Sequence, residues 1–276
     1  MKVLVLANFG MGLYNFRKEL LEELIKRKHK VYISLPYDEY IPKLKKLGCV
    51  FIDTPVSRRG TNPITDFKLF VKYRRIINDI KPDIVLTYTI KPNIYGGIAS
   101  RLQNTQYIAN ITGLGTAVEK SGLLQKITLF LYKISLKEAR CVFFQNEENK
   151  RFLLDRKIVE GNCKVLPGSG VNLEKYSLLD YPPDGVIKFL FISRVMKEKG
   201  IDQYLDAAKY IKSKYPNTEF HVVGFCEEAY EEKLKDLDDS GIIKYHGQQS
   251  NVISFYQNTH CTIHPTYYPE GMSNVL

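Results

Sequence analysis

Two cations, Arg194 and Lys199, occupy a stretch that the sequence predicts to be a turn between a strand and a helix. The apolar run at residues 189–192 precedes them, and helical spacing begins near Ile201. Such a turn presents free backbone N–H groups and the positive end of a helix dipole, both of which favour an anion. Two cationic side chains there suit a ligand with several negative charges, such as a diphosphate. The alternative is that both are ordinary solvent-facing turn residues.

A carboxylate, Glu270, follows the fourth predicted strand of the same half of the chain. Gly271 comes next, and Ser273 is placed to begin a helix. A carboxylate at that position offers several acceptor sites to the hydroxyls of a sugar. Together with the cationic turn, this pattern indicates a ligand that carries both phosphates and hydroxyls.

Two glycines, Gly10 and Gly12, lie between the first predicted strand and the first predicted helix, and we expect a turn over residues 10–17 and a helix over 14–28. A dinucleotide-binding fingerprint would need a third glycine at position 15, which is Asn15. No acidic residue ends the second strand, which closes before Pro36, so a dehydrogenase is disfavoured. The turn either lets a substrate approach the backbone or is purely structural.

Strands and helices alternate along both halves of the chain, which predicts parallel sheets covered on both faces. We expect an α/β protein with two Rossmann-like, doubly wound domains, residues 1–168 and residues 169–276, the second incomplete. Ligands of such sheets bind outside the carboxyl ends of the strands. The second alternation predicts a helix over residues 227–237, a strand over 242–246 and a strand over 261–264. His264 would end that last strand as a lining residue of the crevice.

The composition of the chain excludes several classes of protein. The 276 residues carry a net charge of +10, yet the cations are dispersed and no nucleic-acid-binding motif is present, so we expect no nucleic acid partner. Five scattered cysteines predict no disulfide framework or zinc site and fit a reducing cytoplasm. Asp236 and Asp238 have Asp-x-Asp spacing but lie on a polar helix beside lysines, so we expect no metal. No apolar run is long enough for a membrane span.

Several motifs carry a family resemblance. Phe-Ile-Ser-Arg-Val-Met-Lys-Glu-Lys-Gly at residues 191–200, with His-Pro-Thr-Tyr-Tyr-Pro-Glu-Gly-Met-Ser-Asn-Val-Leu at 264–276, resembles the nucleotide-sugar half of a family 4 glycosyltransferase with the GT-B fold. Asn-Ile-Thr-Gly-Leu-Gly at 110–115 and Gly-Met-Gly-Leu-Tyr-Asn-Phe-Arg at 10–17 are similar to the branch that assembles bacterial capsule, O-antigen and other glycans. The resemblance covers essentially the whole chain.

This resemblance implies a retaining hexosyltransferase that uses a nucleoside-diphosphate sugar, UDP-linked in our expectation, and needs no metal or other cofactor. Arg194 and Lys199 would stabilise the leaving phosphates and Glu270 would orient the sugar. The expected donor-binding set is Gly10, Gly12, Arg194, Lys199, Glu270, Gly271, Met272 and Ser273. The expected acceptor side consists of Asn15, Thr112, Gly113 and Gly115.

The sequence departs from the family pattern at its end. The family's motif has a second glutamate, implied to hold the nucleotide ribose, and it would fall just beyond Leu276. We therefore expect a truncated second domain, weak donor binding and an unstable second half. Two alternatives stay open: a GT-B nucleotide-sugar epimerase, and a catalytically silent sugar-nucleotide-binding protein.

The acceptor in this branch is a glycan on a polyprenyl diphosphate at the cytoplasmic face of the membrane. Residues 67–75 and 123–133 mix apolar and cationic side chains on predicted helices, which suits an anionic membrane surface. A core-packed helix with a basic outer edge gives the same pattern. We expect a cytoplasmic protein with peripheral contact to the inner face of the cell membrane.

Overall fold

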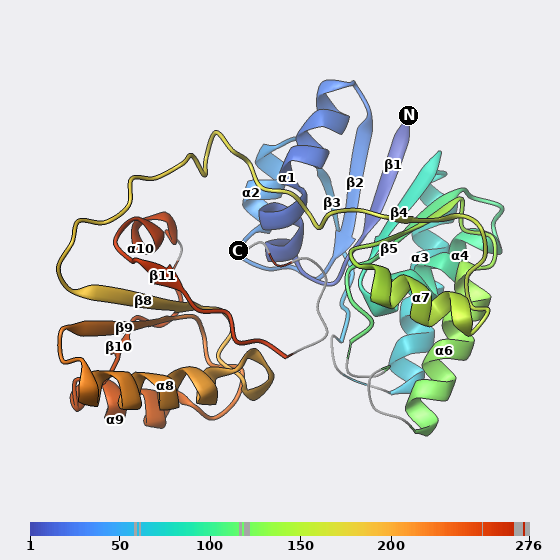
Figure 1. Cartoon of the computed structure of the whole chain (residues 1–276). Coiled ribbons are helices and arrows are strands. Elements are labelled where there is room, and N and C mark those ends of the chain that lie inside the picture. The colour runs from blue at the N-terminus through green and yellow to red at the C-terminus, as the bar shows by residue number, and fades with distance from the viewer. Residues whose placement is uncertain are drawn as a thin grey trace. The chain divides into compact units, whose positions relative to one another are not determined.

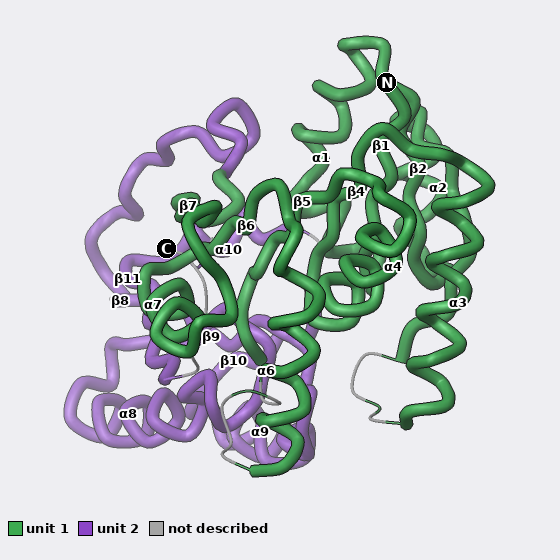
Figure 2. The backbone as a smooth tube through the Cα atoms, turned by 90° about the vertical axis from the view of Figure 1, so that its right-hand side faces the viewer, with its two compact units in different colours: residues 1–170, 269–272 green, residues 171–268, 273–276 purple. Residues whose placement is uncertain are grey.

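The computed structural model describes residues 1–57, 60, 62–115, 118, 122–249, 251–267 and 273. The described chain divides into two units, shown in different colours in Figure 2. Unit 1 comprises residues up to 170, and unit 2 begins at residue 171. The division expected from the sequence, between residues 168 and 169, lies two residues earlier.

Unit 1 is a parallel sheet with helices on both faces (Figure 1). In its described residues the strand order is β3-β2-β1-β4-β5-β6-β7. The strands are β1 (Lys2–Leu6), β2 (Lys30–Leu35), β3 (Val50–Asp53), β4 (Ile84–Tyr88), β5 (Tyr107–Ile111), β6 (Cys141–Phe144) and β7 (Cys163–Val165). The helices are α1 (Gly10–Lys26), α2 (Ile41–Lys46), α3 (Pro63–Ile80), α4 (Gly97–Arg101), α6 (Leu123–Leu136) and α7 (Glu147–Asp155), with a π-helical turn η1 (Pro92–Gly96) before α4.

The alternation of side chains along β1 explains the two layers of helices. Leu4 and Leu6 belong to the core beneath α3, α4 and α6, whereas Val3 and Val5 belong to the core beneath α1 and α2. Successive side chains of a strand point to opposite faces, so an all-apolar central strand must be covered on both. The doubly wound fold expected from the sequence is confirmed.

The start of α1 differs from the sequence prediction. The helix begins at Gly10, so Gly10 and Gly12 lie in its first turn rather than in a separate loop that continues to Arg17. Glycine has low helix propensity, which is why the sequence favoured a turn. The carboxylate of Asp38 accepts the Gly10 N–H at 2.5 Å, and a negative charge at a helix N-terminus is stabilising.

Unit 2 is a smaller parallel sheet with the strand order β10-β9-β8-β11 in its described residues. Its strands are β8 (Ile187–Ile192), β9 (Thr218–Val223), β10 (Lys244–Tyr245) and β11 (Cys261–Thr262). Its helices are α8 (Ile201–Lys214), α9 (Glu231–Asp239) and α10 (Ile253–Gln257), with a 3-10 turn η2 (Lys197–Lys199) before α8. Phe191, Phe220 and Val222 pack beneath α8 and α9, and the opposite face carries Leu190, Ile192 and Val223 beneath α10.

Three boundaries in unit 2 were wrong in the sequence prediction. The helix expected from residue 227 begins at Glu231, because residues 225–227 run beside the turn after β8: Glu227 N–H bonds the Val195 carbonyl. The strand expected over residues 242–246 contains only Lys244 and Tyr245. The last strand ends at Thr262, so His264 lies two residues beyond it. Short edge strands of this kind leave little pattern in the sequence.

Among the described residues, no helix combines the length and the apolar character required to cross a bilayer.

Candidate functional site

The cationic turn between β8 and α8 is built as the sequence predicted. The backbone leaves the sheet at Ser193, forms η2 and enters α8 through Gly200. Gly200 has a left-handed φ of 76°, and a Cβ there would lie 2.2 Å from the carbonyl oxygen of Pro265. Glycine is therefore required at this position by both conformation and space. The turn that carries Arg194 and Lys199 is fixed by the segment after β11, which crosses it.

Lys199 is the most unusual charge in unit 2. It is only 4% exposed, and burial, together with the neighbouring charge of Arg194, lowers the pKa of its ammonium group to about 8. Burial disfavours the charged form of a lysine, and a second cation adds to the effect. A bound anion beside Lys199 would stabilise its charged form and raise its pKa again. An ordinary solvent-facing lysine would not show this shift.

Arg194 is held by a carboxylate that the sequence analysis did not single out. Its guanidinium donates to Glu227 at 2.5 Å, with the Arg194 side chain 35% exposed and that of Glu227 16% exposed. A guanidinium has five N–H donors, so this bond leaves others for a ligand. The available signal was weak: Glu227 lies three residues beyond a glycine at the end of β9.

The loop that carries Glu227 approaches the cationic turn closely. A Cβ on Gly224 would lie 1.7 Å from the carbonyl oxygen of Ser193, and Val195 N–H bonds the Phe225 carbonyl. These contacts join the carboxyl ends of β8 and β9 into one rigid rim. Arg194 is thereby presented from a packed backbone rather than from a free loop.

His264 reaches the same rim from the segment after β11. Burial, with a contribution from the charge of Lys199, lowers the pKa of His264. A histidine that is neutral at pH 7 can donate or accept a hydrogen bond without adding charge. The structure therefore brings Arg194, Lys199 and His264 to one end of the sheet in unit 2. Glu270, Gly271 and Met272 lie outside the described residues, and Ser273 is half-buried.

In unit 1 the predicted glycines have structural neighbours of their own. A Cβ on Gly10 would lie 2.3 Å from Asp38 Oδ1, and a Cβ on Gly12 would lie 2.7 Å from the ring of Phe9. The nearest atoms belong to the ends of side chains in unit 1, so neighbours within this unit already limit the space at both glycines. Their role toward a donor stays a prediction.

A cavity of about 360 Å³ lies at the carboxyl ends of β4, β5 and β6 in unit 1. Of the four residues predicted for the acceptor side, Thr112 lines it. Asn15 is exposed on α1, Gly115 adopts a left-handed φ of 69°, and a Cβ on Gly113 would meet no atom within 4 Å. The wall is largely apolar and includes Phe16, Leu20, Leu86, Tyr88, Ile108 and Phe143.

Besides Thr112, the cavity has polar side chains that the sequence analysis did not name as site residues: Arg17, Glu19, Asn110, Gln145 and Ser169. The Arg17 guanidinium lies 5.1 Å from the centroid of the Tyr88 ring, a cation–π contact, and both residues line the cavity. Asn110 also lines it, and its side-chain amide donates to the Thr87 carbonyl at 3.2 Å. Arg17 and Asn110 belong to the motifs at residues 10–17 and 110–115 that carry the family resemblance. Their place in these motifs was the sequence signal that could have identified them as site residues.

Two further residues at this end of the sheet carry strain or an unmet polar group. Thr89, directly after β4, has a φ of 72°, which is rare for a β-branched residue. Among the described residues, neither Thr89 Oγ1 nor Asn8 Oδ1, both buried, has a hydrogen-bond partner. Asn8 follows β1, the neighbour of β4. Strain and unmet polar groups at a strand end are typical of functional sites, and neither can be detected from a sequence.

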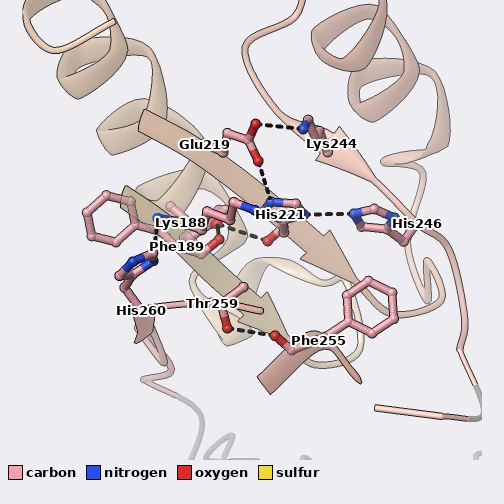
Figure 3. Close-up of polar contacts among 10 residues, drawn as sticks. Lys188, Phe189, Glu219, His221, Lys244, His246, Phe255, Thr259 and His260 are labelled. Atoms are coloured by element: carbon pink, nitrogen blue, oxygen red, sulfur yellow. Dashed lines mark hydrogen bonds and ion pairs between the residues drawn. The ribbon is translucent and has the colours of Figure 1, made fainter. Parts of the chain in front are cut away.

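A second polar cluster in unit 2 lies beneath α10 (Figure 3). His221 Nδ1 and His246 Nε2 are 3.0 Å apart in stacked rings, and His221 Nε2 contacts Glu219, which also pairs with Lys244 at 2.8 Å. The two histidines line a cavity of about 200 Å³. Burial lowers the pKa of both. Within the described residues no group of three or more histidine, cysteine or carboxylate side chains is placed to hold a metal ion.

Two doubly wound parallel sheets, the second with a buried cationic turn after its first strand, are typical of the GT-B class of proteins. Comparison with known families agrees. A family model described as glycosyl transferase 4-like matches residues 2–146, and one described as glycosyl transferases group 1 matches residues 181–276. The chain belongs to the glycosyl transferase 4-like family and is a glycosyltransferase.

Two of the similar proteins have names that include a sugar linked to diphospho-undecaprenol. The chain is 27% identical to the N,N'-diacetylbacillosaminyl-diphospho-undecaprenol alpha-1,3-N-acetylgalactosaminyltransferase of Campylobacter jejuni, over 97% of this chain and 75% of that protein. It is 26% identical to the UDP-Gal:alpha-D-GlcNAc-diphosphoundecaprenol alpha-1,3-galactosyltransferase of Escherichia coli, over 62% of this chain and 47% of that protein. Against the crystal structure of Anabaena HepE in complex with UDP and glucose, the TM-score is 0.76 at 14% identity, covering 100% of this chain and 77% of that chain.

Proposed function

We propose that this glycosyltransferase moves a hexosyl group from a UDP-sugar to a glycan carried on a polyprenyl diphosphate, with retention at the anomeric carbon, in the synthesis of a surface polysaccharide. The use of a UDP-sugar donor is supported by the burial of Lys199 beside Arg194 in the turn before α8. The acceptor half draws on the two relatives whose names include a diphospho-undecaprenol. The chain spans three quarters of one and less than half of the other.

The chemistry assigns these residues one main role. The bond from the anomeric carbon to the phosphate oxygen breaks, the acceptor oxygen forms the new bond, and the acceptor proton goes to the departing phosphate. Negative charge grows on the diphosphate while positive charge grows on the sugar. Arg194 and Lys199, fixed before the reaction, stabilise that leaving group, an effect worth several kcal/mol in preorganised sites.

Donor orientation and acceptor binding fall to other residues. We assign Glu270, with Gly271, Met272 and Ser273, to the hydroxyls of the donor sugar. Gly10 and Gly12 border the donor. Thr112, with Asn15, Gly113 and Gly115, borders the acceptor, to which the apolar cavity adds Arg17 and Tyr88. The acceptor places the enzyme at the cytoplasmic face of the membrane as a peripheral protein.

The test is UDP binding by isothermal titration calorimetry to the 276-residue chain and to Lys199→Ala and Arg194→Ala. Removing one charge-assisted contact costs about 1.5–3 kcal/mol, so we expect affinity to fall about ten- to a hundredfold. The matched control is Lys209→Ala, which removes an exposed lysine on α8. Unchanged UDP affinity in both site variants would refute the assignment of the cationic turn.

Turnover separates this function from its alternatives. Release of UDP should require an acceptor, and the sugar should appear on it. An epimerase would convert the donor alone, and a silent binding protein would retain affinity without any release of UDP.

A further inference from the structure

Helix α6 of unit 1 turns large apolar side chains toward solvent. Leu123 is 75% exposed, Ile127 48% and Phe130 63%. Their spacing of four and three residues places them on one face, and the opposite side of the helix buries Thr128, Tyr132 and Ser135. The apolar residues of this helix therefore do not all serve the core.

The same exposed face carries only positive charge. Lys126 lies three residues after Leu123 and four before Phe130, and Lys133 lies three residues after Phe130; both lysines are exposed. The helix contains no acidic residue. A solvated face would normally mix both signs of charge, so this combination of apolar and cationic side chains is unusual.

Helix α3 repeats this arrangement over its first four turns, and an exposed acid, Asp79, follows near its end. Ile64 is 68% exposed, Phe67 64% and Val71 44%, and exposed Lys68 and Arg75 lie between and after them. The buried side is formed by Leu69, Tyr73, Ile76 and Ile77. The acid of the first turn, Asp66, is bonded instead to Lys91 at 2.5 Å and to Tyr95 at 3.0 Å.

The two faces begin at the same end of unit 1. Helices that connect parallel strands run antiparallel to them, so the first turns of α3 and α6 lie at the carboxyl edge of the sheet. Figures 1 and 2 show both first turns at that end, and both helices pack against α4 and η1. We define the helix-tip surface as Ile64, Phe67, Val71, Leu123, Ile127 and Phe130 with the cations Lys68, Arg75, Lys126 and Lys133.

We infer that the helix-tip surface docks unit 1 onto an anionic lipid bilayer, with the apolar side chains among the headgroups and the cations on the lipid phosphates. Interfacial helices combine aromatic and aliphatic side chains with Lys and Arg in this way. A second copy of the chain is disfavoured as occupant, because a symmetric dimer would bring two cationic patches together. The inference does not depend on the proposed sugar transfer, since vesicle binding needs neither donor nor acceptor.

The experiment is co-sedimentation of the 276-residue chain with vesicles of phosphatidylglycerol and phosphatidylcholine in equal parts. We expect binding at about 0.05 M NaCl that weakens strongly at about 0.5 M NaCl, where charges are screened. Binding to pure phosphatidylcholine should be much weaker. Each cation near an anionic surface contributes roughly a fivefold increase in partitioning, so Lys126→Gln with Lys133→Gln should lower it about 25-fold.

Matched variants separate this surface from a general effect of charge or hydrophobicity. Lys209→Gln with Lys235→Gln makes the same change in charge at exposed positions of unit 2 and should lower partitioning much less. Phe67→Ser with Phe130→Ser should weaken binding at least about tenfold. Leu173→Ser with Leu178→Ser changes two exposed leucines of unit 2 and should leave vesicle binding unchanged.

Three results would overturn the inference: no binding of the wild type to anionic vesicles at low salt, equal binding to neutral vesicles, or equal losses in the control variants. A dimer in sedimentation velocity that Phe67→Ser with Phe130→Ser dissociates would also overturn it, because the surface would then be a protein interface. UDP affinity, measured without vesicles, should be unchanged in all these variants.

Discussion

The carboxyl ends of the two sheets have opposite chemistry. In unit 2 the rim after β8 and β9 carries Arg194 and the buried Lys199, held by tight backbone contacts. In unit 1 the corresponding edge opens into a largely apolar cavity in which Arg17 lies over Tyr88. The same doubly wound topology thus carries buried and half-buried cations at the strand ends of one unit and a largely apolar cavity at those of the other. The side chains at the carboxyl ends of the strands, and not the fold itself, determine which ligand can bind.

The first prediction tests the rigidity of the unit 2 rim. Gly200→Ala should lower the stability of unit 2 by more than about 3 kcal/mol, because the new Cβ meets a backbone carbonyl at 2.2 Å. Gly241→Ala is the matched control: its φ of 70° is similar, but a Cβ there meets nothing within 4 Å, so the loss should be only about 1–2 kcal/mol. Urea unfolding followed by circular dichroism measures both, and equal losses would show that conformation alone matters.

The second prediction uses the titration of Lys199. Because its pKa in the free protein is lowered to about 8, the charge that attracts UDP should be lost as the pH rises through that value. UDP affinity should therefore fall between pH 7 and pH 9 in the wild type, by calorimetry in buffers of constant ionic strength. Lys199→Ala should bind weakly at both pH values, without that fall. The same decline in the variant would assign the titration to another group.

The third prediction separates the two sheet edges. Arg17→Ala removes the cation of the apolar cavity and should lower acceptor-dependent turnover about tenfold, a loss near 1.4 kcal/mol in transition-state stabilisation. UDP affinity should be unchanged, because Arg17 lines the cavity that we assign to the acceptor. Lys18→Ala, on the next position of α1, is the control. A loss of UDP affinity in Arg17→Ala would contradict the separate roles of the edges.

The smallest expected effect concerns the histidine pair beneath α10. Burial lowers the pKa of His221 and His246 below 6.5, despite Glu219 beside His221 and an attraction from Asp238 toward the His246 cation. The folded state thus binds fewer protons than the unfolded state just below pH 6.5, so their contribution is complete above that pH and is lost as the pH falls.

Urea midpoints at pH 7.5 and pH 5.5 measure this contribution. The wild type should lose stability between these values, and His221→Gln with His246→Gln should lose less. The lowered pKa of Glu219, due first to Lys244, acts below pH 4.5 and lies outside this window. An equal loss in the variant would exclude the pair as the cause.

Much of the fold could be predicted from the sequence, for a clear physical reason. The apolar strands and amphipathic helices follow periods that a sequence displays directly, so the alternation and the parallel sheets were predicted correctly. The errors occurred where local propensity was overridden. The carboxylate of Asp38 accepts the Gly10 N–H at the start of α1, which favours a helix there despite the two glycines. Residues 225–228 run along the turn after β8, to which Glu227 N–H is bonded, and so do not join α9.

The sequence by itself determined the family, the two parallel α/β units and the positions of Arg194 and Lys199 at a strand-to-helix turn, because these depend on residue type and short-range spacing. The tertiary structure decided the rest. The burial of Lys199 depends on the rim around it, the partner of Arg194 lies 33 residues away in Glu227, and Thr112 joins Arg17 and Tyr88 only at a shared sheet edge. The burial of a side chain, its pairing and backbone strain all arise from contacts between segments that are distant in the sequence, so no local sequence pattern predicts them.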